Sequence, residues 1–179
     1  MTIAPVLTIA GSDSSGGAGI QADLKTMTML GCFGMSAITA LTAQNTTGVR
    51  EICPVPAAFL EQQIAAVCED IPPLAVKIGM VYDIPQIHAI AAAVRKYRLP
   101  HVVVDPVMVA TSGDALLRSQ AQTALTQELF PLAEVITPNL PEARQLTGME
   151  ITSPAEMEQA AGTLAERYRT AVLLKGGHS

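Results

Sequence analysis

Hydrophobic and polar positions along the chain follow two alternating periods. Short apolar runs bounded by Gly, Pro or polar residues are typical of buried strands, and they occur at residues 6–10, 35–41, 74–78, 101–104, 134–136 and 171–174. Between these runs, apolar residues recur every three or four positions, which predicts amphipathic helices. These segments are residues 18–30, 56–69, 84–97, 119–129 and 154–168. The alternation predicts an α/β fold with a mostly parallel sheet and right-handed crossovers.

Turn and cap signals support these boundaries. Pro56, Pro85 and Pro154 stand where helices are expected to begin, a position that suits proline because its missing N–H would have no partner there. Gly148 indicates a helix end. Residues 48–54 are a candidate for an additional strand at the edge of the sheet.

Composition favours a sheet that helices cover on both faces. Hydrophobic residues make up 49% of the chain, charged residues 15% and aromatic residues 3%, and Trp is absent. A core of small aliphatic side chains is typical of parallel sheets buried between helices. With 179 residues, no internal repeat and no linker, the sequence predicts one domain over residues 1–179.

Charge and targeting features narrow the function classes. The net charge of −5 gives no general attraction to nucleic acid or to an anionic membrane. The apolar runs are too short to span a bilayer, and the N-terminus lacks the features of a signal peptide. Cys32, Cys53 and Cys68 form no Cys-x-x-Cys pair, so neither disulfides nor zinc are indicated. We therefore expect a cytoplasmic protein with no nucleic-acid or membrane partner.

The segment AGSDSSGGAGIQADLK, residues 10–25, is the most informative part of the sequence. It joins an expected strand to an expected helix, so its backbone N–H groups and the positive helix end meet at one place. Such a place suits an anion or a polar small molecule, and glycines allow a close approach of the backbone to a ligand. The segment contains Gly11, Gly16, Gly17 and Gly19.

This segment matches neither common nucleotide motif fully. A P-loop would place Lys after its second glycine, and Gly17 stands there instead. The letters of a dinucleotide fingerprint fit residues 17–22, but residues 33–50 contain neither Asp nor Glu for the ribose. A further alternative is that the segment is only a tight strand-to-helix turn that binds no ligand. In that case Asp23 is a solvated or capping carboxylate.

Other polar groups follow the expected strands, where open α/β sheets bind ligands. The amides of Gln44 and Asn45 offer donor and acceptor side by side and could read a ring edge, or they could simply form a polar turn. Gly79 suits a close ligand approach, and Met80 could pack against a ring or belong to the core. Asp105 follows three valines and needs a partner, a metal or solvent.

Two further groups are equally open. Asn139 and Glu142 are three residues apart and share a helical face, which suits a magnesium–water shell or a phosphate. The same spacing also fits an N-cap with its capping-box glutamate. Lys175 precedes a glycine pair and is either a phosphate ligand or a surface residue.

Taken together, these groups resemble a known family. Residues 8–23, TIAGSDSSGGAGIQAD, are similar to the opening signature of bacterial hydroxymethylpyrimidine/phosphomethylpyrimidine kinases, members of the ribokinase-like superfamily. Later motifs match in order at residues 42–46, 77–80, 105–108, 137–142 and 173–178. The resemblance covers the whole chain and implies a ribokinase-like three-layer α/β/α fold with a mostly parallel central sheet.

The resemblance also implies an activity. These enzymes use ATP and Mg²⁺ to phosphorylate 4-amino-5-hydroxymethyl-2-methylpyrimidine and then its monophosphate in thiamine biosynthesis. The implied partners are the pyrimidine and ATP, and a homodimer stays open. Two alternatives remain: a pyridoxine or pyridoxal kinase, which shares much of this layout, and a non-catalytic domain that binds a thiamine precursor.

The resemblance assigns residues to both halves of the site. Gln44 would bond to the aminopyrimidine edge, and Asp23 would hold a polar group near the hydroxymethyl arm. The whole pyrimidine pocket would consist of Gly11, Asp23, Gln44, Met80 and Val107. ATP would be bound by Lys175, Asp105, Asn139 and Glu142, the last two also at magnesium.

One part of the family pattern has no counterpart in residues 1–179. The family continues for about a further third, with a Gly-Thr-Gly-Cys type loop that forms an anion hole and supplies a catalytic cysteine. The resemblance therefore implies that this loop lies beyond Ser179 and that the domain is truncated at its C-terminus. No catalytic residue is expected within the chain, and the chain alone is expected to be inactive.

Overall fold

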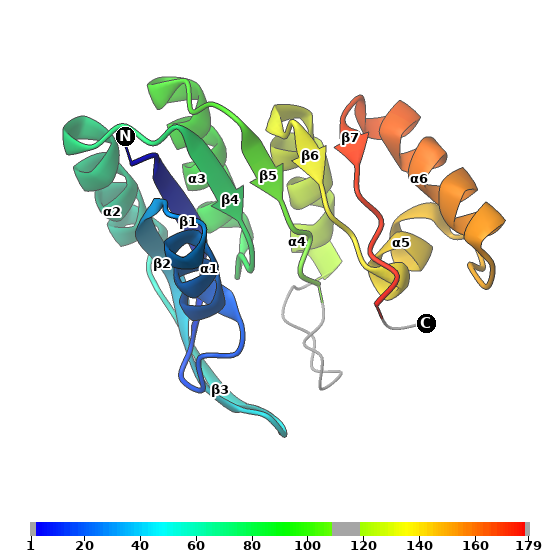
Figure 1. Cartoon of the computed structure of the whole chain (residues 1–179), viewed down its shortest axis with the longest axis horizontal. Coiled ribbons are helices and arrows are strands. Elements are labelled where there is room, and N and C mark those ends of the chain that lie inside the picture. Colours follow the sequence, from blue (N-terminus) through cyan, green and yellow to red (C-terminus); the bar gives the residue numbers. More distant parts are fainter. Residues whose placement is uncertain (1–2, 109–118, 178–179) are drawn as a thin grey trace.

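A mostly parallel sheet forms the centre of the molecule (Figure 1). The computed structural model describes residues 3–108 and 119–177. Within them the sheet has seven strands in the order β3-β2-β1-β4-β5-β6-β7. The strands are β1 (Pro5–Asp13), β2 (Phe33–Asn45), β3 (Gly48–Pro54), β4 (Ala75–Ile78), β5 (Val102–Val104), β6 (Val135–Ile136) and β7 (Ala171–Val172). Only β3 runs antiparallel to its neighbour, which confirms the edge strand predicted at residues 48–54.

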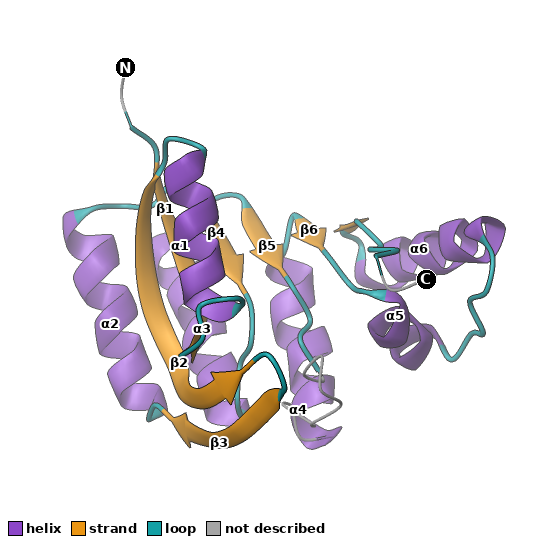
Figure 2. Ribbon diagram, turned by 60° about the horizontal axis from the view of Figure 1, so that its bottom comes forward, coloured by secondary structure: helices purple, strands orange, loops and turns teal. Residues whose placement is uncertain are grey.

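Helices cover the sheet in layers, as the sequence predicted. Figure 2 shows α1 on one face of the sheet and α2, α3 and α4 together on the other. The helices are α1 (Gly19–Met29), α2 (Ala57–Asp70), α3 (Ile84–Tyr97), α4 (Ser119–Ala124), α5 (Leu140–Thr147) and α6 (Pro154–Tyr168). The arrangement is the three-layer α/β/α architecture.

Local capping explains where several helices begin. Asp83 accepts a hydrogen bond from the backbone N–H of Gln86 at the start of α3. Ser153 and Glu156 form a reciprocal capping box at the start of α6. These caps satisfy N–H groups that have no partner inside the helix. The predicted bounds of α3 and α6 are confirmed to the residue.

Two expectations about helices need correction. The helix predicted over residues 119–129 is α-helical only to Ala124. It continues as a π-helical turn over Leu125–Leu129 and a 3₁₀ turn over Phe130–Leu132. Pro131 has no N–H for an α-helical bond to the carbonyl of Gln127, so an α-helix cannot continue regularly through this segment. Helix α5 was not predicted, because its short apolar pattern follows a strand of only two residues.

The main core lies between the sheet and the layer that contains α2, α3 and α4. Its largest fully buried side chains are almost all aliphatic: Phe130, Leu7, Ile9, Leu60, Ile64, Ile78, Ile87, Ile90, Leu129, Ile136, Ile151 and Leu164. The ring of Phe130 meets Tyr168 edge to face, with centroids 4.8 Å apart. This packing fixes the strands in register, so their carboxyl ends meet along one edge of the sheet.

Candidate active site

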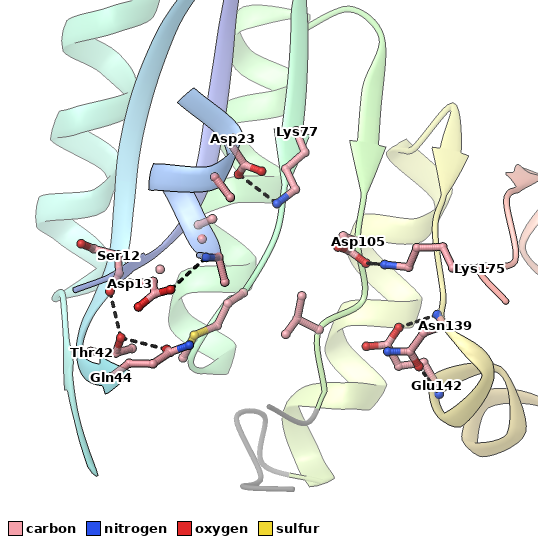
Figure 3. Close-up of a pocket in the computed structure, with 17 residues that line it drawn as sticks. Ser12, Asp13, Asp23, Thr42, Gln44, Lys77, Asp105, Asn139, Glu142 and Lys175 are labelled. Carbon is pink, nitrogen blue, oxygen red and sulfur yellow. Dashed lines mark hydrogen bonds and ion pairs between the residues drawn. The ribbon is translucent and has the colours of Figure 1, made fainter. Parts of the chain in front are cut away.

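A cavity of about 350 Å³ opens at the carboxyl ends of the central strands (Figure 3). Strand β1 pairs with β2 on one side and with β4 on the other, so strands β2 and β3 are added on one side of β1 and β4 to β7 on the other. A crevice at such a switch point is the usual ligand site of an open α/β sheet. The start of α5 and the segment after β7 complete the wall.

Every residue that the family resemblance assigned to the pyrimidine or to ATP lines this one cavity. They are Gly11, Asp23, Gln44, Met80, Val107, Asp105, Asn139, Glu142 and Lys175. Sequence reasoning did not assign several polar side chains that also line it: Ser12, Asp13, Thr42 and Lys77. Their positions depend on strand pairing and on folding of the loop, which the residue types alone do not reveal.

The glycine-rich loop is built around its own carboxylate. Oδ2 of Asp13 accepts hydrogen bonds from the backbone N–H groups of Gly17 (3.0 Å) and Ala18 (2.8 Å). Oδ1 accepts from the backbone N–H and the hydroxyl of Ser15, both at 2.8 Å. Asp13 therefore occupies the backbone N–H groups of Ser15, Gly17 and Ala18, which are not available to an external anion. Binding of an anion or a polar small molecule by the rest of the loop stays a prediction.

This environment changes the acidity of Asp13, which is almost fully buried. Burial raises the pKa of the carboxyl, but the hydrogen bonds from Ser15, Ala18 and Gly17 outweigh it and hold the pKa below its ordinary value. The loop also requires glycine. A Cβ on Gly19, whose φ is +55°, would lie 2.2 Å from the carbonyl oxygen of Gly11.

Gln44 lies at one end of the cavity with one half of its amide engaged. The single hydroxyl hydrogen of Thr42 is shared between Oε1 of Gln44, at 3.1 Å, and the backbone carbonyl oxygen of Ser12, at 3.0 Å. The side-chain hydroxyl of Ser14 donates to the backbone carbonyl of Gln44 and accepts from the backbone N–H of Gln44. Among the described residues Nε2 of Gln44 has no hydrogen-bond partner, so it is available to a ligand.

Apolar side chains form the wall beside Gln44. Met80 is buried and packs with Ala40 in a small cluster to which Val107 also belongs. The sulfur of Met80 lies 3.0 Å from where a Cβ on Gly11 would be, so a larger residue at that position would require Met80 to shift. A flat ring fits such a surface.

Two lysine–aspartate pairs face the same cavity (Figure 3). Nζ of Lys77 lies 2.9 Å from Oδ2 of Asp23, and Nζ of Lys175 lies 2.7 Å from Oδ1 of Asp105. All four side chains are partly exposed, so a charged or polar ligand in the cavity can reach both pairs. Asp105 thus has the partner that its position after three valines required.

Asn139 and Glu142 have the capping geometry and also line the cavity. The side-chain oxygen of Asn139 accepts from the N–H of Glu142, and Oε2 of Glu142 accepts from the N–H of Asn139. Burial, followed by the negative charge of Asp105, raises the pKa of Glu142 above its ordinary value, although Lys175 and nearby amides oppose the rise. The capping interpretation is confirmed, and a ligand role is compatible with it.

The described ranges 3–108 and 119–177 contain no cluster of three or more His, Cys, Asp or Glu arranged as a metal site. Mg²⁺ commonly keeps several waters and binds through one or two carboxylates together with substrate phosphates. Glu142, buried near Asp105, offers a carboxylate of that kind. The residues therefore fit a magnesium ion that is shared with a nucleotide.

Three other expectations have different outcomes. Gly79 does not line the cavity, and the space left by its missing side chain faces Lys77 and Ala10, so the expected close ligand approach is wrong. The end of the motif at residues 173–178 falls partly outside the described residues, since it includes His178. Within residues 3–108 and 119–177, no helix is both long and apolar enough to cross a membrane.

Comparisons with known proteins agree with this geometry. The family model described as phosphomethylpyrimidine kinase matches residues 13–179. The chain is 50% identical over 178 residues to the hydroxymethylpyrimidine/phosphomethylpyrimidine kinase of Bacillus subtilis, covering 99% of this chain and 66% of that protein. The chain therefore spans just under two thirds of the length of this curated relative.

Solved structures show the same similarity. A crystal structure of phosphomethylpyrimidine kinase from Clostridium difficile 630 has a TM-score of 0.89 and 50% identity, and the match covers 98% of this chain and 76% of that one. Pyridoxal kinase from Staphylococcus aureus, in complex with AMP-PCP and pyridoxal, has a TM-score of 0.85 and 37% identity. That match covers 99% of this chain and 64% of the other.

Proposed function

The chain belongs to the phosphomethylpyrimidine kinase family, and from this premise we propose the reaction that its cavity serves. The reaction is ATP-dependent phosphorylation of 4-amino-5-hydroxymethyl-2-methylpyrimidine and of its monophosphate, in thiamine biosynthesis. One observation carries the proposal: the residues assigned from the sequence to a pyrimidine and to a nucleotide all line a single cavity. Residues 1–179 would form part of one kinase domain, working in the cytoplasm.

The pyrimidine would lie at the end of the cavity that contains Gln44. The unengaged Nε2 of Gln44 can donate to a ring nitrogen, while Met80 and Val107 pack against the ring faces. Asp23 would face the hydroxymethyl arm. Gly11 allows the ring to approach the backbone of β1.

The nucleotide would lie at the opposite end. Lys175 would exchange its bond to Asp105 for the phosphates, because a phosphate offers a stronger negative partner. Asn139 and Glu142 would hold the water shell of magnesium, which when bound neutralises charge on the phosphates. Phosphoryl transfer depends mainly on positioning and on charge neutralisation, and these residues supply part of both.

The pyridoxal kinase alternative rests on the structural similarity reported above. Identity to the pyrimidine kinases is 50%, against 37% to pyridoxal kinase, and this difference favours the pyrimidine. A domain that binds the precursor without turnover would need the same pocket. Both alternatives are separated from the main proposal by measuring ligand binding and turnover on the same preparation.

Isothermal titration calorimetry on the chain tests the proposal. We expect tighter binding of hydroxymethylpyrimidine than of pyridoxine, and formation of the monophosphate when ATP and Mg²⁺ are added to a form that carries the family's anion-hole loop. Tighter binding of pyridoxine would favour the alternative kinase. Binding of the pyrimidine without any phosphorylation in that form would favour the non-catalytic domain.

A further inference from the structure

The two carboxylate oxygens of Asp23 have different surroundings. Oδ2 accepts a hydrogen bond from the hydroxyl of Thr8 at 2.6 Å and another from Nζ of Lys77 at 2.9 Å. Oδ1 has no hydrogen-bond partner among the described residues. Asp23 lines the cavity, and its side chain is 18% exposed (Figure 3). One oxygen is thus anchored, and the other remains an unused acceptor.

The sheet fixes the two groups that anchor Oδ2. Thr8 on β1 and Lys77 on β4 are direct partners in the register of these parallel strands, so their side chains lie side by side on one face. Helix α1, which carries Asp23, covers that face. Thr8 is fully buried, and its hydroxyl therefore depends on Asp23 as its acceptor.

Gly79 provides the space that the ammonium group of Lys77 occupies. A Cβ on Gly79 would lie 2.7 Å from Nζ of Lys77 and 3.1 Å from Cβ of Ala10. Any larger residue at this position would push the ammonium group aside. The glycine that follows β4 therefore helps to set the position of Lys77 and does not contact a ligand itself.

We infer that Thr8 and Lys77 are positioning residues, which hold Oδ2 of Asp23 and so present Oδ1 to the hydroxyl group of the substrate. The inference rests on the proposed function and adds a specificity role to that site. Because Oδ2 accepts two hydrogen bonds, the side chain of Asp23 is restricted to one rotamer, and Oδ1 is held in a fixed place. A carboxylate oxygen can only accept, so it selects a ligand that donates there.

Recognition of the hydroxyl also fits the division of the cavity. Gln44 lies at a different part of the wall from Asp23 (Figure 3) and offers an amide suited to the ring edge. A pyrimidine that carries a methyl group in place of the hydroxymethyl group would leave Oδ1 without a donor. Sites built around a hydroxyl discriminate strongly against ligands that lack it.

Calorimetry with two ligands tests this inference in the absence of nucleotide. The ligands are hydroxymethylpyrimidine and 4-amino-2,5-dimethylpyrimidine, which differ only by the hydroxyl group. We expect the unmodified chain to prefer the first by about tenfold or more, as for a hydrogen bond to a charged group. Thr8→Val and Lys77→Met should remove most of this preference, while affinity for the dimethyl ligand stays nearly unchanged.

Matched variants separate positioning from general damage. Thr39→Val removes another fully buried hydroxyl, which donates to the backbone of Met80, and should keep the preference. Lys96→Met removes an exposed lysine that pairs with Glu69 and Tyr97 away from the cavity lining, and should also keep it. Thr8→Ser should restore the preference lost in Thr8→Val. Gly79→Ala keeps the charge of Lys77 but displaces it, and should lower the preference.

Several results would overturn the inference. Equal weakening of both ligands in Thr8→Val and Lys77→Met would show a merely structural role. An unmodified chain that binds both ligands equally would overturn the hydroxyl contact while leaving the proposed function intact. An unmodified chain that binds neither ligand would overturn the proposed function, and this inference with it.

Discussion

At the scale of single residues, Gln44 offers the cavity a donor that no other described residue engages. Replacing it by alanine should weaken binding of hydroxymethylpyrimidine by about 1–3 kcal/mol, or roughly 5- to 150-fold in Kd, because buried ligand groups lose their partner. Calorimetry on Gln44→Ala measures the effect. Asn45→Ala is the matched control, since the amide of Asn45 only caps a turn at Thr47. Equal effects from the two substitutions would remove Gln44 from the site.

Glu142 should show a conflict between stability and function. Its pKa lies above the ordinary 4.5, chiefly because of burial. A carboxyl group whose pKa is higher in the folded than in the unfolded chain lowers the stability of the fold as pH rises from 4.5 through its folded pKa. Glu142→Gln keeps the capping geometry, so it should raise the melting temperature at pH 8, have no such effect below pH 4.5, and weaken binding of magnesium–ATP.

Glu156→Gln provides a control of opposite sign. Glu156 occupies the same capping position in α6, but hydrogen bonds from Thr152 and Ser153 lower its pKa to about 2. Its removal should therefore lower stability at neutral pH and leave nucleotide binding unchanged. Calorimetric unfolding and ATP titrations on both variants check the pair. A melting temperature of Glu142→Gln equal to or below that of the unmodified chain at pH 8 contradicts the electrostatic argument.

The sequence predicted which residues share the cavity better than it predicted their bonds. Polar residues at strand ends were placed together because parallel strands end at one edge of the sheet, and this was confirmed for Gln44, Asp105 and Lys175. The Lys175–Asp105 bond joins residues 70 positions apart. Lys77 was missed as a pocket residue because its partner, Asp23, is 54 positions away. Such pairs depend on strand register, which no local pattern encodes.

At the scale of elements, the glycine-rich loop should be sensitive to the charge of Asp13. Asp13→Asn places an amide opposite N–H donors from Gly17 and Ala18, so the free energy of unfolding should fall by about 1–3 kcal/mol. The pKa of Asp13 in the folded chain lies below the ordinary 3.8. The stabilisation is therefore fully present above pH 3.8 and is lost as the pH falls below 3.8 through the lower, folded pKa.

Urea unfolding at pH 7 and at pH 3.5 tests this prediction. The difference between Asp13→Asn and the unmodified chain should be larger at pH 7 than at pH 3.5. Asp70→Asn, at the exposed end of α2, should show no comparable difference. A difference that does not depend on pH would mean that the carboxylate charge does not organise the loop.

Elements were predicted well where periodicity and capping agree. Helix α3 has both an Asp83 cap and a long apolar stripe, and its predicted bounds are confirmed. The break after Ala124 was missed because the apolar spacing continues through Leu129, although the backbone bonding does not. Helix α5 was missed although its cap was recognised, because eight residues carry too little periodicity to identify a helix.

At the scale of the whole molecule, α1 leaves part of one sheet face uncovered. Register partners Thr8, Lys77, Val103, Val135 and Ala171 form one row across β1, β4, β5, β6 and β7. The row is buried at Thr8, half-buried at Val103 and Val135, and exposed at Ala171. Farther along, Leu173 is 60% exposed. Strand β7 is also the last strand of the sheet within the described residues.

An exposed apolar face beside an open strand edge favours association between chains. We therefore expect the 179-residue chain to self-associate with rising concentration, because contact would remove Val103, Val135 and Leu173 from water. Leu173→Glu should shift the equilibrium toward monomer by placing a charge within this contact. Phe59→Glu replaces a side chain of similar exposure, 55%, on the opposite layer and should leave association unchanged.

Sedimentation velocity at about 1–100 µM distinguishes the outcomes. Leu173 and Phe59 lie on different layers of the molecule, so charge alone does not explain an effect confined to the first variant. A monomer at all concentrations, or equal dissociation by both substitutions, would show that the uncovered face makes no contact. An effect limited to Leu173→Glu would identify that face as the surface through which the chain associates.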